Sequence, residues 1–231
     1  MKQVSAIICT YNEAETIEDV IIFLSISKIV NEIIVVNDGS TDNTENIIKR
    51  VKKHINIKDI HFKENKGKGY AMATGVENAT NEIVVFVDAD QTVIVDGYVE
   101  QIVKCLLSEE SDMVLGYSTV KFLTKDINPL KILTGERALY KKDVFPILDK
   151  MKESRFGVET LLYFYFISIG KSIKFIKLVG LKHKTKYEKN SIAKATINYV
   201  KEGWEIAHTA GKNHDLMLKS IKKSINKKRN I

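Results

Sequence analysis

The sequence predicts an α/β fold with a mainly parallel central sheet flanked by helices. Over residues 1–115, short runs rich in Val and Ile alternate with segments of helical character, the pattern of parallel strands joined by right-handed crossovers. The run Ile83–Val87 is apolar throughout, as expected of a strand that is buried on both faces. Polar segments follow four of the predicted strands, at the edge where such sheets bind their ligands.

The composition excludes several classes of protein. The chain has 231 residues, of which 44% are hydrophobic, so it is long and apolar enough to bury a core. Its two cysteines, Cys9 and Cys105, exclude a disulfide scaffold and a four-cysteine zinc site and favour a reducing compartment. The apolar runs Val4–Cys9 and Leu161–Ile169 are too short for a signal peptide and for a membrane span. We therefore expect a cytoplasmic protein.

The first half of the chain supplies the elements of this sheet in order. Enrichment in Val and Ile predicts strands at Val4–Cys9, Glu32–Asn37, Ile57–Phe62, Glu82–Val87 and Asp112–Leu115. The segments between them predict helices at Glu13–Ser25, Thr41–Val51, Gly69–Asn78 and 96–108. Thr41 and Asp42 carry the acceptor side chains that favour an N-cap for the second of these helices.

The second half is less regular. Residues 117–128 and 182–190 carry mixed charge and predict loops, and Ser172–Leu181 predicts a strand. Helices are expected at Leu130–Tyr140, Asp143–Met151, Gly157–Ile169, Ile192–Ala210 and Leu216–Ile225. We expect one compact domain over residues 1–190, with a nucleotide-binding half (1–116) and an acceptor half (117–190), followed by a helical basic extension over residues 191–231.

The positive charge is concentrated at one end of the chain. The formal net charge is +7, and the last thirteen residues contain six Lys and Arg side chains and no acidic ones. A basic helix of this kind is suited to an anionic membrane surface, and a solvated end is the alternative interpretation. The rest of the chain shows no aromatic platform and no zinc spacing, so we expect no nucleic-acid partner.

The segment Asp88-Ala89-Asp90 closes the fourth predicted strand. Two carboxylates that flank one residue can reach a hard divalent cation together, and Mg²⁺ or Mn²⁺ held by carboxylates and substrate phosphates is common in nucleotide sites. A solvated turn is the alternative for this short motif. We expect a site for Mg²⁺ or Mn²⁺ here.

Two further strand ends suit a nucleotide. Asp38 lies within Asn37–Asp42, where it can accept hydrogen bonds from a base or ribose, although a simple turn and helix cap explains the neighbouring residues. The glycines of Asn65-Lys66-Gly67-Lys68-Gly69 precede a helix, where the backbone can approach an anion and Lys68 can meet a diphosphate. This segment matches neither the dinucleotide fingerprint nor the P-loop, which disfavours dehydrogenases and P-loop phosphotransferases.

Taken together, these segments resemble the successive signatures of family 2 glycosyltransferases. The similar segments are Thr10–Glu13, Val35–Asp42, Asn65–Gly69 and Val87–Asp90. The resemblance covers residues 1–115 strongly and 130–190 more loosely. It departs from the family at Cys9, where Pro is usual, and at Asn37, where Asp is frequent. It implies a GT-A fold, a UDP- or GDP-linked sugar donor and a divalent metal.

The resemblance also implies roles for particular residues. Donor binding falls to Thr10, Tyr11, Glu13, Asp38, Lys68, Asp88 and Ala89. Metal binding falls to Asp88, Asp90 and His183, with a surface histidine as the alternative for the last. Asp90 and Glu159 are the catalytic carboxylates, and Gly135, Glu136 and Arg137 resemble an acceptor-binding segment. Glu159 is the one carboxylate available as a base at the acceptor helix, because no Glu-Asp pair appears there.

The acceptor is expected to bear a phosphate. A phosphate monoester is ionised near neutral pH, with a second pKa of about 6, and needs little help from a base. The side chains expected to receive it are Arg137, Lys141, Lys142, Lys182, Lys184 and Lys186. We expect a polyprenyl or dolichyl phosphate, which also explains the basic end as a peripheral contact at the inner face of the cell membrane. A soluble acceptor, as in glucosyl-3-phosphoglycerate synthases, and a non-catalytic nucleotide-sugar-binding protein are the alternatives. A homodimer is an alternative use of the terminal helices.

Overall fold

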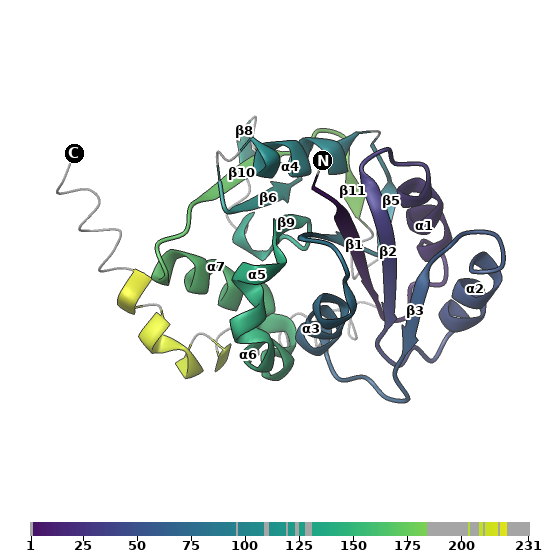
Figure 1. Ribbon diagram of the computed structural model, residues 1–231, viewed down its shortest axis with the longest axis horizontal. Helices are drawn as coiled ribbons and strands as arrows, with labels where there is room; N and C mark the ends of the chain where they lie inside the picture. Colours follow the sequence, from purple (N-terminus) through teal and green to yellow (C-terminus); the bar gives the residue numbers. More distant parts are fainter. Residues whose placement is uncertain are drawn as a thin grey trace.

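A seven-stranded sheet forms the centre of the molecule, in the order β10-β6-β9-β4-β1-β2-β3 (Figure 1). The computed structural model describes residues 2–95, 97–108, 111–118, 120–122, 125–127, 131–183, 203, 208–209, 211–216 and 218–220. The strands of this sheet are β1 (Val4–Thr10), β2 (Val30–Asn37), β3 (Lys58–His61), β4 (Ile83–Asp88), β6 (Met113–Tyr117), β9 (Arg137–Tyr140) and β10 (Ile173–Lys177). All neighbouring pairs are parallel except the two that involve β9, which confirms the predicted mainly parallel sheet.

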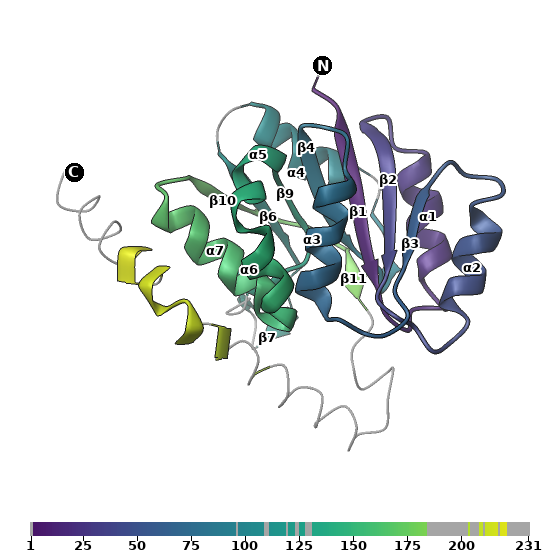
Figure 2. The ribbon, with the colours of Figure 1, turned by 60° about the horizontal axis from the view of Figure 1, so that its bottom comes forward.

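Helices cover both faces of the sheet. One apolar core contains residues of α1 (Ile17–Ser25), α2 (Thr44–Val51) and α4 (Tyr98–Leu107). A second core, on the other face, contains residues of α3 (Lys68–Asn78), α5 (Lys141–Val144), α6 (Leu148–Glu153) and α7 (Val158–Ser168). Figure 2 shows α3, α6 and α7 side by side across this face. Alternate residues of β1 and β4 enter the two cores, and nearly all of these side chains are buried, because each face of the sheet is covered by helices.

The second predicted helix begins later than expected. It starts at Thr44 rather than Thr41. The Asp42 carboxylate accepts hydrogen bonds from the Thr44 backbone N–H at 3.0 Å and from its hydroxyl at 2.5 Å. The first N–H groups of a helix have no partner within the helix. Asp42 supplies one for the Thr44 N–H from outside it.

The prediction of a helix over Leu130–Tyr140 is wrong. Residues Lys131–Leu133 form one 3₁₀ turn, and Arg137–Tyr140 form strand β9, inserted antiparallel between β4 and β6. The side chains of Arg137, Ala138 and Leu139 are fully buried. Hydrogen bonds to a strand on each side and burial on both faces outweigh the local helix propensity, which is a weak preference.

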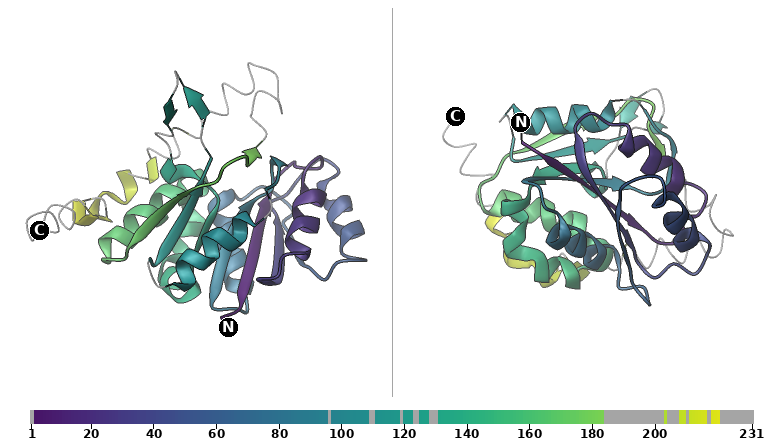
Figure 3. Two further views of the ribbon diagram at one scale, coloured as in Figure 1. Left: turned by 90° about the horizontal axis from the view of Figure 1, so that it is seen from above. Right: turned by 45° about the vertical axis from the view of Figure 1, so that its right-hand side comes forward.

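Smaller elements complete the described part of the chain. Two 3₁₀ turns, Phe145–Ile147 and Arg155–Gly157, flank α6. Part of the predicted loop over 117–128 instead forms a hairpin of β7 (Val120–Phe122) and β8 (Lys125–Ile127), which stands at the carboxyl side of the main sheet (Figure 3). A second pair joins β5 (Gln91–Val93) and β11 (Lys182–His183). The predicted terminal helices fall mostly outside the described residues. Those described near the end of the chain are helical at 203, 208–209, 211–212, 214–216 and 218–220.

Candidate active site

Three strand ends meet at the carboxyl edge of the sheet. In the β1–β2 register Thr10 lies opposite Asn37, and in the β1–β4 register Cys9 lies opposite Asp88. The Asp38 backbone N–H donates to the Thr10 carbonyl at 2.8 Å. The polar segments that follow these strands in the sequence are therefore neighbours in space, as the sequence predicted.

Lys68 connects the two halves of this site. Its ammonium group donates to Asp88 Oδ1 at 3.0 Å and lies 2.8 Å from Glu159 Oε1. Burial by itself lowers the pKa of this amine, but the two carboxylates outweigh burial and hold the pKa of Lys68 well above its ordinary value. One cation thus neutralises a carboxylate at the end of β4 and another at the start of α7.

The Asp38 carboxylate shapes the loop that precedes α3. Its two oxygens accept the backbone N–H groups of Lys66 at 2.7 Å and of Gly67 at 2.9 Å. Burial raises the pKa of Asp38 although both hydrogen bonds oppose the rise, and the residue is only 4% exposed. Gly67 has a φ of +97°, a conformation that favours glycine. Asp38 therefore positions the residue that leads directly into Lys68, and its contact with the nucleoside stays a prediction.

The turn that follows β1 depends on a residue that the sequence did not single out for a role of its own. Asn12 adopts a left-handed conformation with a φ of +58°. Its side-chain oxygen accepts the Thr41 backbone N–H at 2.8 Å, and its own N–H donates to Ser40 Oγ at 2.9 Å. The predicted donor-binding residue Tyr11 beside it is 44% exposed. Asn is tolerant of positive φ and bonds to nearby backbone, which is the local signal that identifies such a position.

The turn Asp88-Ala89-Asp90 is held by the residue that precedes α1. The Thr16 hydroxyl donates to the Ala89 carbonyl at 2.6 Å, and the Ala89 side chain is buried in the core. Within the described side chains, no group of three His, Cys, Asp or Glu residues is arranged to hold a metal ion. The backbone of His183 pairs with that of Gln91, directly after the turn, whereas its side chain lies outside the described part. Carboxylates on such a turn suit a hard divalent cation.

The predicted acceptor segment packs against this turn. A Cβ atom at Gly135 would lie 2.0 Å from Asp88 Oδ1. Glu136 and Arg137 are fully buried. The Arg137 guanidinium donates to the Thr134 carbonyl and, at 3.5 Å, to the Glu159 carbonyl. Burial lowers the pKa of Arg137, and Glu159 and Asp88 oppose the effect. Contact of these three residues with an acceptor stays a prediction, and their burial favours a supporting role.

Two other residues near Lys68 were not predicted. Cys9 lies among Lys68, Asp38, Asp88 and Glu159, and burial raises the pKa of its thiol, so Cys9 is neutral and a poor nucleophile. Arg155 adopts a φ of +48° and packs against Gly67, and its charge acts on Asp38. Arg155 is therefore a cation of the site itself, which only the packing of α6 against α3 reveals.

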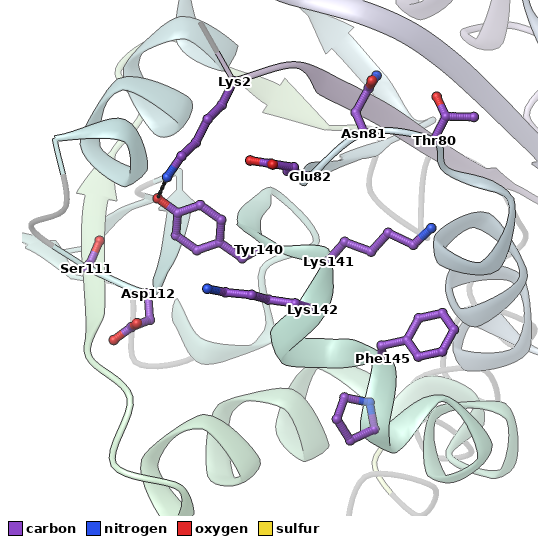
Figure 4. A pocket seen from close by; sticks show the side chains of 11 residues that line it. Lys2, Thr80, Asn81, Glu82, Ser111, Asp112, Tyr140, Lys141, Lys142 and Phe145 are labelled. Atoms are coloured by element: carbon purple, nitrogen blue, oxygen red, sulfur yellow. Dashed lines mark hydrogen bonds between the residues drawn. The ribbon is translucent and has the colours of Figure 1, made fainter.

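Lys141 and Lys142 lie at the wrong end of the sheet for the role the sequence predicted. Because β9 is antiparallel to β4, Tyr140 pairs with Ile83, the first residue of β4. The two lysines therefore line a separate pocket of about 890 Å³ (Figure 4). There Lys2 donates to the Tyr140 hydroxyl at 3.3 Å. Neither Lys141 nor Lys142 can receive an acceptor at the Asp88 edge.

Comparisons with known proteins give a family match over most of the chain. Residues 5–165, more than half of the chain, match the family described as Glycosyl transferase family 2. The poly-beta-1,6-N-acetyl-D-glucosamine synthases of Staphylococcus epidermidis and Staphylococcus aureus are 42% and 35% identical to this chain over 94 residues. These residues are 40% of this chain and 23% of each relative. The chain thus spans less than a quarter of the length of the curated relatives it matches.

Solved structures show a similar fold. Glucosyl-3-phosphoglycerate synthase from Mycobacterium tuberculosis, in complex with Mn²⁺, uridine diphosphate and glucosyl-3-phosphoglycerate, has a TM-score of 0.68 and 20% identity over 90% of this chain and 78% of that one. Its complex with Mn²⁺, UDP-glucose and phosphoglyceric acid has a TM-score of 0.66 and 22% identity over 91% and 80% of the two chains. This likeness confirms the predicted architecture. No helix in the described part of the chain has both the length and the apolar character of a membrane span.

Proposed function

Since the chain belongs to glycosyl transferase family 2, we propose that it transfers a hexose from a UDP- or GDP-linked sugar to a phosphate-bearing acceptor. The contact of Lys68 with both Asp88 and Glu159 carries this proposal. It joins the end of β4, where the family signature implies the donor, to the start of α7, where it implies the acceptor. Transfer requires the donor and the acceptor to lie next to each other, and holding two reactants together in the correct geometry supplies much of the rate enhancement.

Asp88 and Asp90 are the residues that would hold a divalent metal, with His183 as a third ligand. The donor set fits, because the Asp88 carboxylate lies at the edge of the sheet with about a quarter of its side chain exposed and hard cations prefer oxygen ligands. The backbone pairing of His183 with Gln91 supports the third ligand. A bound Mg²⁺ or Mn²⁺ would supply a Lewis acid for the diphosphate leaving group.

The side chains of this site can position both substrates without a strong base. The acceptor oxygen attacks the anomeric carbon on the face opposite the diphosphate, so that the configuration inverts. Lys68 and Arg155 provide positive charge for phosphate oxygens. Glu159 is only partly available as a base, because Lys68 holds one of its oxygens at 2.8 Å. A phosphate acceptor suits this arrangement because it is already ionised near neutral pH, with a second pKa of about 6.

We propose polyprenyl phosphate as the first acceptor to test, with the basic end of the chain as its membrane contact; residues 221–231 lie outside the described part. A soluble phosphate acceptor is the second candidate, favoured by the fold shared with glucosyl-3-phosphoglycerate synthase. A non-catalytic nucleotide-sugar-binding protein is disfavoured by the intact Asp88, Asp90 and Glu159.

A partition assay tests the proposal. The protein is incubated with Mn²⁺ or Mg²⁺, labelled UDP-glucose or GDP-mannose, and both polyprenyl phosphate and 3-phosphoglycerate. Label in the organic phase supports the lipid acceptor, and label in a new anionic aqueous product supports the soluble one. Donor binding without transfer to either would contradict the phosphate acceptor.

The matched variants are Asp90→Ala and Asp149→Ala, the latter removing an exposed carboxylate on α6. We expect Asp90→Ala to abolish transfer and Asp149→Ala to retain it. Equal activity of both variants would contradict the assigned metal site.

A further inference from the structure

The segment Thr134–Glu136 is anchored on one side to β6. The Gly116 N–H donates to the Glu136 carbonyl at 2.8 Å, and the Thr134 hydroxyl donates to the Gly116 carbonyl at 2.5 Å. On the other side, β9 pairs with β4 so that Arg137 lies opposite Phe86. Continuing this antiparallel register brings Glu136 and Gly135 beside the last residues of β4.

The Glu136 side chain then reaches under the Asp88–Asp90 turn. Its Oε1 atom accepts the Asp88 backbone N–H at 3.1 Å and the Gln91 side-chain amide at 2.7 Å. One carboxylate oxygen therefore holds the first residue of the turn and the residue that follows it. The same Gln91 nitrogen donates its other proton to the Tyr98 hydroxyl at 2.7 Å, which fixes the amide in this orientation.

Gly135 meets the turn from the side. A Cβ atom there would lie 2.0 Å from Asp88 Oδ1 and 2.3 Å from its Cγ, distances that require the carboxylate to move. Only glycine lets the Asp88 side chain lie against this backbone. Gly135 and Glu136 thus act on the same turn, Glu136 through its side chain and Gly135 because it has none.

From this geometry we propose that Glu136 is a positioning residue for the Asp88-Ala89-Asp90 turn, and that Gly135 and Glu136 serve the metal and donor side of the reaction. This inference rests on the proposed use of a divalent metal at Asp88 and Asp90. The Glu136 carboxylate is fully buried and adds a fixed negative charge beneath the two ligands. Attraction between charges is strong in a poorly solvated interior, so the charge favours a bound cation without touching it.

The hydrogen bonds of Glu136 are those of an acceptor, because its Oε1 atom receives the Asp88 N–H and the Gln91 amide. A buried carboxylate is tolerated when hydrogen bonds to its oxygens compensate for lost hydration, and these two bonds fix it against the turn.

Two variants separate this role from contact with the acceptor. Glu136→Gln keeps the shape and the accepting oxygen but removes the charge, and Gly135→Ala displaces the Asp88 carboxylate. Glu153→Gln, on an exposed side chain of α6, is the charge-matched control. Mn²⁺ binding is followed by electron paramagnetic resonance without substrates, the KM of donor and acceptor is measured separately, and the melting temperature of each variant reports folding.

We expect Glu136→Gln and Gly135→Ala to weaken Mn²⁺ binding about tenfold or more, which corresponds to ~1.4 kcal/mol. Both variants should raise the donor KM while the acceptor KM stays within about twofold. Glu153→Gln should bind Mn²⁺ as the unmodified protein does. Unchanged Mn²⁺ binding in both folded variants, or a rise in the acceptor KM alone, would overturn the inference and favour an acceptor contact. An unmodified protein that binds no Mn²⁺ would overturn the metal use itself.

Discussion

The Lys68 ammonium lies 2.8 Å from Glu159 Oε1, so the first residue of α3 is paired with the second residue of α7. The same ammonium group holds Asp88 at 3.0 Å. The cation therefore stands between the end of β4 and the start of α7, the two places that we propose for the metal and the acceptor. Any donor or metal that binds Asp88 has to share this carboxylate with Lys68, which couples the two sides.

Lys68→Met tests this coupling. We expect transfer to fall by about 100-fold, as when one preorganised donor is removed from an active site. Mn²⁺ should bind more tightly, because Asp88 loses a competing cation and the local charge becomes more negative. The measurements are kcat/KM and Mn²⁺ affinity by electron paramagnetic resonance. Lys53→Met, at an exposed position after α2, is the control, and weaker Mn²⁺ binding in Lys68→Met would contradict the shared-carboxylate account.

Asn12 is expected to tolerate glycine better than alanine. Its φ is +58°, and an L-residue other than Gly, Asn or Asp in this region is strained by about 1–2 kcal/mol. Both substitutions also remove the hydrogen bond from the Thr41 N–H. Urea unfolding should therefore show Asn12→Ala to be less stable than Asn12→Gly by about 1 kcal/mol. Equal stabilities would mean that the lost hydrogen bond, and not the backbone, sets the cost.

Gly69 is required for the packing of α3 against α6. A Cβ atom there would lie 2.2 Å from the Met151 carbonyl oxygen and 2.5 Å from Ser154 Oγ. Overpacking of this kind costs about 1–3 kcal/mol, so Gly69→Ala should lower the free energy of unfolding by that amount and reduce transfer by shifting Lys68. Gly211→Ala has nothing within 4 Å of its new methyl group and should leave the stability unchanged or slightly raised. Thermal or urea unfolding of Gly69→Ala and Gly211→Ala measures this difference in stability.

Asp112 is expected to stabilise the protein above the acid range. Although burial opposes ionisation, hydrogen bonds from Lys171 at 2.8 Å and from the Ser172 N–H at 2.8 Å lower the pKa of Asp112 below its ordinary value of 3.8. The folded state thus binds the proton less readily than the unfolded state, so the stabilisation is present above pH 3.8 and is lost as the pH falls through the folded-state pKa. These bonds join β10 to β6 at their starts.

Asp112→Asn should therefore lower the unfolding free energy at pH 7 by about 1 kcal/mol, and the difference from the unmodified protein should shrink during acid titration. Unfolding curves in urea at several pH values measure this. A difference that stays constant down to the acid transition would show that Asp112 acts through packing alone. The exposed Asp149→Asn provides the baseline for loss of one carboxylate.

Local patterns in the sequence were sufficient to predict the first half of the chain. The alternation of apolar strands and helices predicts that β1, β2 and β4 are parallel, because both the burial of strands and the turn residues at their ends are encoded within a few neighbouring residues. Asp38, Lys68 and Asp88 were predicted at one edge for the same reason, and the structure brings them together there. The predicted relationship to family 2 glycosyltransferases is confirmed by the match over residues 5–165.

The second half was decided by contacts between residues far apart in the chain. Leu130–Tyr140 has a helical pattern, yet β9 forms within it because a strand there completes hydrogen bonds with β4 and β6. That antiparallel insertion carries Lys141 and Lys142 to the far end of the sheet.

The sequence by itself determined the type of fold and the carboxylates at the strand ends, because short-range periodicity and turn chemistry specify them, and the resemblance of its motifs indicated the family. Tertiary structure alone decided that Glu136 lies buried beneath Asp88, and that Lys68 joins Asp88 to Glu159. These contacts depend on the register of β9 and on the packing of α3 against α6. Register and packing are set by the total burial and hydrogen bonding of the folded chain, which no local pattern contains.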